Sequence, residues 1–219
     1  MGDTLFERYI DTVPRLWNAY VHHPWMDAIH DGTLSMERFQ FFLAQDMPYQ
    51  TDFLNALLLA STRSADPEAW LWLRSFIAAE AAFEVSLLEE MGVPYSFDRW
   101  DAGPAREGYM NHLTRVALEG SVGRIGAALL PCAAGFTGAM AEPADTSAHH
   151  PHLRRWLEFY ERPVQAEFSN RLVGVFEDAM RDVGEAEREQ TRMIFVRSLQ
   201  HQVEVFDAAW RLSDEWRVE

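Results

Sequence analysis

Apolar side chains recur three and four positions apart along most of this 219-residue chain, and no segment shows the convincing alternation of a half-buried strand. This spacing gives each helix one apolar face, so the chain must fold by packing such faces together. Because no linker interrupts the pattern, the sequence predicts an all-α bundle of about eight helices, folded as a single domain over 1–219. Prolines, glycines and capping residues place these helices at 4–20, from Thr33 or Ser35 to about 62, and at 67–91, 104–118, 121–140, 151–160, 163–183 and 185–214.

The charged residues exclude several classes of function. The formal net charge is −15, and all 19 basic residues are arginines because the chain contains no lysine. An acidic protein is a poor partner for nucleic acid or for an anionic membrane, since both bind clustered cations. Schiff-base catalysis, pyridoxal phosphate attachment and a phosphate-binding P-loop all require a lysine, so these classes are excluded.

The apolar runs are interrupted before they reach the length of a membrane span, and the first residues lack the basic and apolar regions of a secretion signal. A single cysteine cannot form an internal disulfide, which agrees with a reducing compartment. We therefore expect a cytoplasmic protein without a membrane partner.

The single cysteine, Cys132, follows Pro131 inside a helical stretch rich in alanine and glycine. A proline within a helix frees a backbone carbonyl and bends the chain. Small neighbouring side chains either let helices approach closely or leave room for a ligand. Free cysteines are mostly buried and inert, but some are nucleophiles. The residues alone leave both roles open for Cys132.

Asp46 lies in the middle of the apolar face of the second expected helix, one turn before Tyr49. A carboxylate in that position is costly to bury unless a partner stabilises it. Two interpretations remain open. Asp46 forms a buried salt bridge or accepts backbone hydrogen bonds, or it binds a polar group of a ligand in a cavity, with Tyr49 as an aromatic wall.

No residue pattern indicates a metal site or a cofactor. The histidines at 149, 150 and 152 lie at the end of a polar loop expected at 141–151, without carboxylates or cysteines at ligand spacing, so we expect a surface loop there. A di-iron site in a helical bundle needs Glu-x-x-His pairs, and neither Glu80 nor Glu84 is followed by a histidine at that spacing.

Several landmarks in order resemble the TenA-like proteins (thiaminase II) of the haem-oxygenase-like fold, over nearly the whole chain. The landmarks are His23-Pro24-Trp25, Asp31-Gly32-Thr33-Leu34 before a helix with Phe39, Gln45-Asp46 with Tyr49, Leu130-Pro131-Cys132, Trp156-Leu157-Glu158-Phe159-Tyr160 and Phe206-Asp207-Ala208-Ala209-Trp210.

This resemblance implies a pyrimidine pocket. Cys132 matches the family's nucleophile, and Asp46 matches the carboxylate that hydrogen-bonds a ring nitrogen and the exocyclic amine of an aminopyrimidine. Phe136 stands where the family usually has a tyrosine. The tyrosines that match residues lining or orienting the pocket are Tyr49, Tyr109 and Tyr160.

The implied reaction is hydrolysis at the carbon attached to the pyrimidine ring, in thiamine salvage. The thiolate adds to the ring while an acid protonates the ring nitrogen, and a water later replaces the leaving group. The family's acid falls at Gln202, which is an amide and cannot donate a proton in this way. Glu204 points roughly 200° away around a helix, so it substitutes only if the register differs. Glu84 is the other candidate acid; a surface or ion-paired glutamate is the alternative.

The implied substrate is 4-amino-5-aminomethyl-2-methylpyrimidine, with thiamine as a slower one. Two other functions remain open because of Gln202. The chain could be a divergent paralogue that acts on another small ring compound, or a non-catalytic protein that binds pyrimidines and regulates. The resemblance also implies a homotetramer, and we expect no cofactor.

Overall fold

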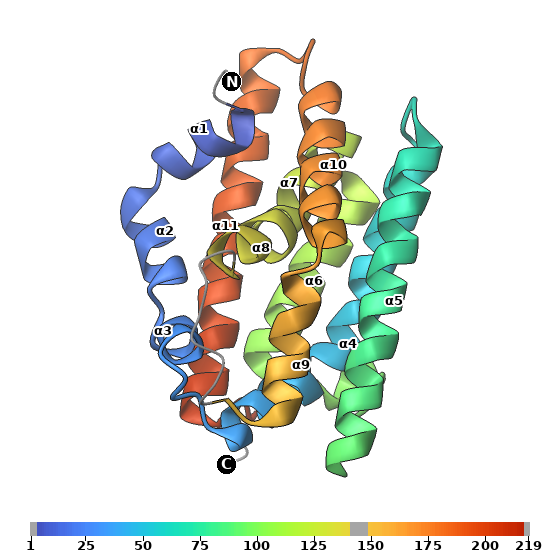
Figure 1. The fold of residues 1–219 in the computed structure, drawn as a ribbon. Helices are drawn as coiled ribbons and strands as arrows, with labels where there is room; N and C mark the ends of the chain where they lie inside the picture. The colour runs from blue at the N-terminus through green and yellow to red at the C-terminus, as the bar shows by residue number, and fades with distance from the viewer. Residues whose placement is uncertain (1–3, 141–148, 217–219) are drawn as a thin grey trace.

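The computed structural model describes residues 4–140 and 149–216, and the regular elements in these ranges are all helical (Figure 1). A 3-10 turn, η1 (Arg99–Asp101), and a π-helical turn, η2 (Pro131–Gly135), accompany the α-helices. The α-helices are α1 (Leu5–Asp11), α2 (Pro14–Val21), α3 (Pro24–His30), α4 (Met36–Ser61), α5 (Pro67–Met91), α6 (Pro104–Glu119), α7 (Val122–Leu129), α8 (Phe136–Met140), α9 (Pro151–Tyr160), α10 (Pro163–Ala179) and α11 (Glu185–Arg211).

Local sequence signals set most of the helix ends. The Ser35 and Asp66 side chains accept hydrogen bonds from the first turns of α4 and α5, which satisfies backbone N–H groups that have no partner within the helix. α5 ends at Gly92, whose φ of 66° lies in the left-handed region that glycine adopts without strain. The predicted boundaries of these helices are therefore close to the observed ones.

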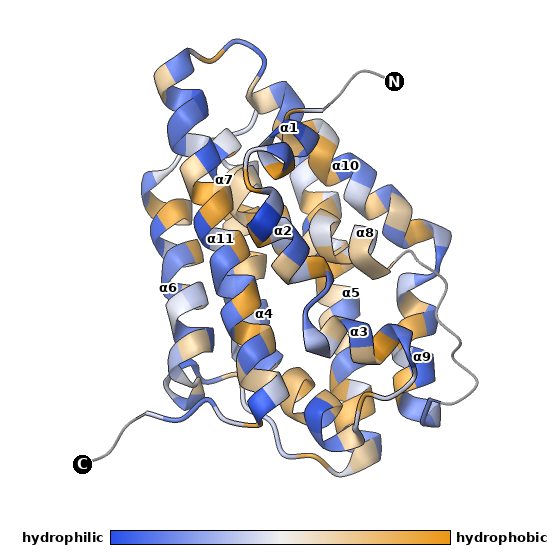
Figure 2. Cartoon of the chain, turned by 90° about the vertical axis from the view of Figure 1, so that its left-hand side faces the viewer, coloured by the Kyte–Doolittle hydropathy of each residue, from blue (hydrophilic) through white to orange (hydrophobic). Residues whose placement is uncertain are grey.

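The long helices α4, α5, α6 and α11 run alongside one another, and α7, α9 and α10 fill the remaining sides (Figure 1). α4 packs most extensively on α5 and α6, while α11 packs on α6 and α7. The short helices α1–α3 lie along the edge formed by α11. A Cβ on Gly126 of α7 would lie 3.2 Å from the Phe176 ring, so glycine permits the close approach of α7 to α10. The core between these helices is built from buried hydrophobic residues, and hydrophobic and hydrophilic residues are interspersed along each helix (Figure 2).

The single helix predicted over 4–20 is wrong, because it divides into α1 and α2. Val13 precedes Pro14 and adopts φ −135° and ψ 51°, outside the helical region, since a residue before proline is disfavoured there. Pro24 is the first residue of α3, a short helix that was not predicted from the sequence. The helix predicted over 121–140 is interrupted by η2.

The expected loop at 141–151 falls mostly outside the described residues. His149 lies within them and is buried, so the expectation of a surface loop is wrong at that position. The His150 side chain accepts a hydrogen bond from the His152 backbone N–H at 3.3 Å and caps α9. His150 therefore has a structural role at the start of this helix.

The stretch Val122–Met140, which runs from α7 through η2 to α8, is long and apolar enough to cross a membrane by length and composition. The expectation that no apolar run reaches this length is therefore wrong. Within the structure, 67 % of the stretch is buried against other helices. This burial is the pattern of a core helix of a bundle.

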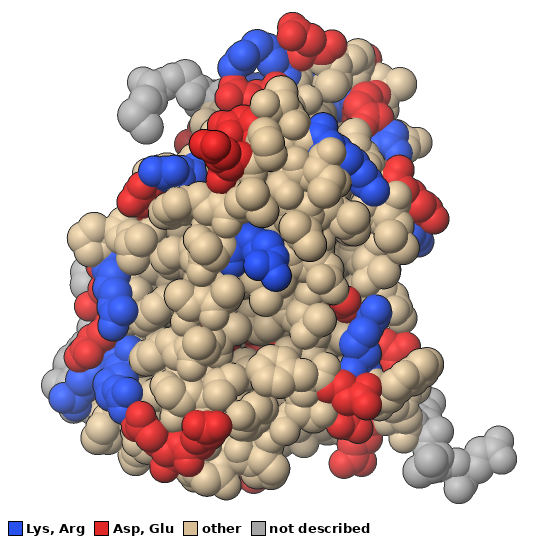
Figure 3. All heavy atoms as spheres, turned by 90° about the vertical axis from the view of Figure 1, so that its right-hand side faces the viewer, with Lys and Arg blue, Asp and Glu red and all other residues tan. Residues whose placement is uncertain are grey.

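One face of α5 is exposed and almost free of charge. Between Trp70 and Glu89 its exposed positions carry Leu71, Ser75, Ala78, Ala79 and Ala82. The space-filling view of this side shows charged groups mainly around the edge, with one basic side chain near the centre (Figure 3). We call these five residues the outer face of α5.

Candidate active site

Cys132 lies on the π-helical turn η2. Pro131 has no backbone N–H to donate, and the turn is closed instead by the Gly135 N–H, which donates to the Leu130 carbonyl at 2.8 Å. The buried Tyr20 hydroxyl of α2 donates to the Pro131 carbonyl at 3.0 Å. The turn that carries the thiol is therefore held from outside by a side chain of another helix.

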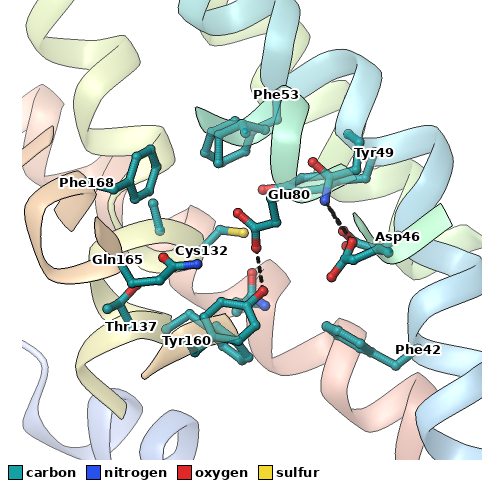
Figure 4. Close-up of a pocket in the computed structure, with 16 residues that line it drawn as sticks. Phe42, Asp46, Tyr49, Phe53, Glu80, Cys132, Thr137, Tyr160, Gln165 and Phe168 are labelled. Atoms are coloured by element: carbon teal, nitrogen blue, oxygen red, sulfur yellow. Dashed lines mark hydrogen bonds between the residues drawn. The ribbon is translucent and has the colours of Figure 1, made fainter. Parts of the chain in front are cut away.

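Cys132 lines a cavity enclosed by the middle of the bundle (Figure 4). The empty space between the lining atoms, including space that is open to solvent, is about 520 Å³. The lining residues come from α4, α5, η2, α8, α9, α10 and α11. They are Phe42, Asp46, Tyr49, Gln50, Phe53, Ile77, Glu80, Glu84, Cys132, Ala133, Phe136, Thr137, Tyr160, Gln165, Phe168 and Gln202.

Both structural roles that the sequence left open for Asp46 are present, because its carboxylate forms a buried ion pair and also lines the cavity. Its Oδ1 lies 2.8 Å from Nη1 of the buried Arg106 on α6, and its Oδ2 accepts a hydrogen bond from Gln50 at 2.7 Å. Burial raises the pKa of Asp46, while the Arg106 charge and the two hydrogen bonds oppose the rise. The ion pair thus favours a carboxylate that still has acceptor capacity for a ligand.

Two more carboxyl groups, from Glu80 and Glu84 on α5, enter the same cavity. Glu84 accepts hydrogen bonds from the Trp156 indole at 2.9 Å and from Gln50 at 3.3 Å, one on each oxygen. Burial, reinforced by the charges of Asp46 and Glu80, raises its pKa well above the usual range. Glu84 is therefore buried inside the site, and the alternative of a surface or ion-paired glutamate is wrong.

Glu80 accepts a short hydrogen bond from the Tyr160 hydroxyl through Oε1. Burial raises the pKa of Glu80 to about 7, with the negative charge of Asp46 adding to the effect and the bond from Tyr160 opposing it. A carboxyl group with a pKa near neutrality both accepts and donates protons at working pH.

The cavity disfavours the thiolate form of Cys132. Burial raises its pKa, and the charges of Asp46 and Glu80 raise it further, while the nearby Tyr49 hydroxyl and Arg106 oppose the rise. Such a thiol attacks only if a base removes its proton, since the thiolate is the nucleophile.

Two buried amide atoms of lining residues have no hydrogen-bond partner among the described residues: Nε2 of Gln165 and Oε1 of Gln202. A buried polar group without a partner costs free energy. These atoms offer both donors and acceptors, so they suit a small ligand that carries hydrogen-bond groups of both kinds.

The structure brings most of the predicted site residues together. Phe136 lies edge-on to Tyr160, with ring centroids 5.2 Å apart, and both line the cavity. Tyr109 is behind the wall, because its ring packs against Tyr49 at 4.9 Å and is not among the lining residues. Tyr109 therefore does not line the pocket but supports Tyr49, which is the orienting one of the two roles that the resemblance implies.

Glu204 is not a candidate acid in this structure. Its side chain is 59 % exposed and contacts His201, whereas Gln202, two residues earlier on α11, is buried and lines the cavity. Gln202 and Glu204 face different sides because two residues along an α-helix differ by roughly 200° around its axis. The assumed register of α11 is therefore confirmed.

Sequence reasoning missed five polar residues of the site: Gln50, Glu80, Arg106, Thr137 and Gln165. A usable signal was present for Glu80, which falls on the same apolar face of α5 as Ile77 and Leu87. Arg106 likewise shares the buried face of α6 with Tyr109. No group of three or more His, Cys, Asp or Glu residues in the described ranges could hold a metal ion.

The fold and the site together define a class: haem-oxygenase-like helical bundles that enclose a small-molecule cavity between their long helices. The chain belongs to the TENA/THI-4/PQQC family, whose profile matches residues 10–212.

Relatives with curated names cover most of the chain. An aminopyrimidine aminohydrolase of Halalkalibacterium halodurans is 22% identical over 202 residues, which is 89% of this chain and 90% of that protein. An aminopyrimidine aminohydrolase of Bacillus subtilis is 22% identical over 200 residues, with 89% and 85% covered. The solved structure of a TenA homologue from P. horikoshii OT3 superimposes with a TM-score of 0.80 at 20% identity, over 96% of this chain and 100% of that one. The fold is therefore shared with TenA structures.

Proposed function

We propose that this chain hydrolyses aminopyrimidines in thiamine salvage, with 4-amino-5-aminomethyl-2-methylpyrimidine as the substrate. The observation that carries this proposal is the presence of the Cys132 thiol and the Asp46 carboxylate in one enclosed cavity. Membership of the family and the names of the two aminohydrolases support the same reaction class.

The lining residues suit the two ends of an aminopyrimidine. Asp46 accepts hydrogen bonds from the exocyclic amine and from a protonated ring nitrogen, because its carboxylate retains free lone pairs beside Arg106 and Gln50. The rings of Tyr49 and Phe136 cover the faces of the substrate ring. The unpartnered amide oxygen of Gln202 accepts a further hydrogen bond from the substrate.

Covalent catalysis explains why a thiol is present. Sulfur adds to the pyrimidine ring, and the resulting intermediate expels the amine from the attached methylene carbon. Water then adds to that carbon, and the thiolate leaves the ring. One difficult displacement is thereby divided into easier steps.

Turnover of the aminomethyl pyrimidine, followed by mass spectrometry of the hydroxymethyl product, tests this proposal. We expect Cys132→Ala to abolish product formation and Asp46→Asn to reduce it by at least about 100-fold, while exposed Asp178→Asn, a matched control, leaves it unchanged. If the wild-type protein at high concentration forms no product, the proposal is wrong. Unchanged activity in Cys132→Ser would instead indicate chemistry without a covalent intermediate, as expected of the divergent paralogue.

The amide at Gln202 favours a second candidate, a non-catalytic pyrimidine-binding or regulatory protein, because the position offers no acid. A ligand that binds only the folded state raises the melting temperature by mass action. Stabilisation by the aminomethyl pyrimidine without any product would support this candidate over hydrolysis.

We further propose a homotetramer in the cytoplasm. The outer face of α5 supports an assembly of copies, because it presents an uncharged surface of small and apolar side chains. Light scattering coupled to size exclusion measures the mass, and Ala78→Arg with Ala82→Arg should dissociate the assembly if this face is the interface. A monomeric wild-type protein would contradict the proposal.

A further inference from the structure

Glu80 occupies a position in the cavity that the family resemblance does not assign. Its carboxyl group lines the same cavity as the Cys132 thiol and is drawn beside the sulfur, with one oxygen bonded to the Tyr160 hydroxyl (Figure 4). Tyr160 engages one oxygen, and the other makes no hydrogen bond to the described residues. Glu80 thus presents a free carboxyl oxygen to the space that a substrate beside the thiol would occupy.

The reaction needs a group that moves protons at two places. The cavity disfavours the thiolate, so the proton of the thiol must be removed, and the ring nitrogen must gain a proton as sulfur adds. Gln202 cannot transfer these protons, because its side-chain amide neither gains nor loses a proton near neutral pH. Neither Asp46 nor Glu84 is as well placed: Asp46 is ion-paired with Arg106, and Glu84 accepts a hydrogen bond on each oxygen.

We propose that Glu80 is the catalytic acid and base of this site, and that it moves the Cys132 proton to the substrate ring nitrogen. This inference rests on the proposed aminopyrimidine hydrolysis. The acid has thus moved from α11, where Gln202 stands, to α5 on another wall of the cavity. Tyr160 is a positioning residue, because its hydroxyl fixes the orientation of the Glu80 carboxyl group.

One carboxyl group is enough to carry out the proton transfers to and from sulfur and the ring nitrogen. Glu80 takes the thiol proton as the carbon–sulfur bond forms, and gives it to the adjacent ring nitrogen, so S–H has added across a C=N bond. Ammonia leaves the methylene carbon with the electron pair of the broken C–N bond. Water adds to that carbon and its proton goes to ammonia. The ring N–H proton returns through Glu80 to sulfur as the C–S bond breaks. A protonated amine and water have become an alcohol and ammonium, with the enzyme restored.

The groups around Glu80 keep the pKa of its carboxyl group close to neutral pH. Burial and the negative charge of Asp46 hold its pKa at about 7. The groups that face it from every side of the cavity are Asp46 of α4 with its partner Arg106 of α6, Glu84 of α5, Cys132 of η2, Tyr160 of α9, and the uncharged Gln165 of α10 and Gln202 of α11. Arg106 is the one cation of this set, and it is already paired with Asp46.

The first test measures turnover of the aminomethyl pyrimidine against pH. Glu80→Gln should lower kcat by about 10²–10⁴-fold and remove the dependence on a group that titrates near pH 7. The hydroxymethyl product should still raise the melting temperature of this variant, since binding is retained. Glu89→Gln, an exposed glutamate of the same helix, is the matched control and should leave kcat unchanged. Turnover of Glu80→Gln within threefold of wild type would overturn the inference and leave the proposed function standing.

The second test needs no substrate and therefore stays informative if the proposed function fails. Because Cys132 is the single cysteine, mass spectrometry after treatment with iodoacetamide reports the reactivity of this thiol alone. If Glu80 accepts the thiol proton, the alkylation rate should rise through a pH near 7, and Glu80→Gln should be at least tenfold slower at about pH 8. Identical pH profiles for the wild type and Glu80→Gln would overturn the inference.

Discussion

The cost of burying the Glu80 carboxylate gives a sharp stability prediction. Glutamate has an ordinary pKa of 4.5, and burial raises that of Glu80 to about 7 in the folded protein. Each tenfold change in proton affinity corresponds to about 1.4 kcal/mol, so this rise amounts to about 3 kcal/mol. Glu80→Gln removes the charge but keeps a side-chain oxygen that accepts the hydrogen bond from Tyr160. We therefore expect this variant to be more stable than the wild type at alkaline pH.

The sign follows from proton binding. Below pH 4.5 the carboxyl group is protonated in both the folded and unfolded states, so burial carries no charge penalty. Between 4.5 and about 7 the folded state holds a proton that the unfolded state releases, so wild-type stability falls as pH rises. Above that interval the full penalty is present. Glutamine does not titrate, so the advantage of Glu80→Gln should grow from near zero to about 3 kcal/mol as the pH rises.

Urea denaturation at several pH values measures the free energy of unfolding of both proteins. The difference between Glu80→Gln and the wild type should follow a titration curve with its midpoint within the interval from 4.5 to about 7. Glu89→Gln should show no such curve, because that side chain is exposed. A difference below about 1 kcal/mol at alkaline pH, or one that does not change with pH, would refute the reasoning. In that case Glu80 would not be a buried carboxyl group with a raised pKa.

Two further substitutions test the supports of the site. Arg106→Met should lower the free energy of unfolding by about 3–5 kcal/mol, because Asp46 is left as a buried charge without a partner. Adding Asp46→Asn should recover part of this loss in urea denaturation. If the losses of the two single variants simply add in the double variant, the two side chains are not coupled. Tyr20→Phe should cost about 1–2 kcal/mol by leaving the Pro131 carbonyl unpaired, and should alter the alkylation rate of Cys132. An unchanged rate would show that the hydroxyl does not hold the turn.

The sequence predicts most helices because their end signals are local. A capping side chain such as Asp66 or a left-handed glycine such as Gly92 acts within one turn of its own helix, so neighbouring residues suffice to identify it. The break between α1 and α2 was missed because apolar spacing continues through Val13, although Pro14 determines the backbone there.

The candidate site could be predicted only in part. Asp46 was found because a carboxylate on an apolar face is unusual, and Cys132 because it is single. The cation that pairs with Asp46 depends on how α4 and α6 meet, and this tertiary contact with Arg106 has no local signal of its own. The same holds for Glu80, whose raised pKa arises from burial by several helices.

The π-helical turn at Pro131–Gly135 also constrains how this chain can evolve. A π turn holds one residue more than the α-helical turn it replaces. Deleting that residue would restore a regular helix, but it would rotate the segments on either side by roughly 100° relative to each other. α7 could then keep its packing against α10, or Phe136 could keep its place at the cavity, but not both. Lineages that retain this site should therefore tolerate substitutions in the turn at positions other than Cys132 far better than a change in its length.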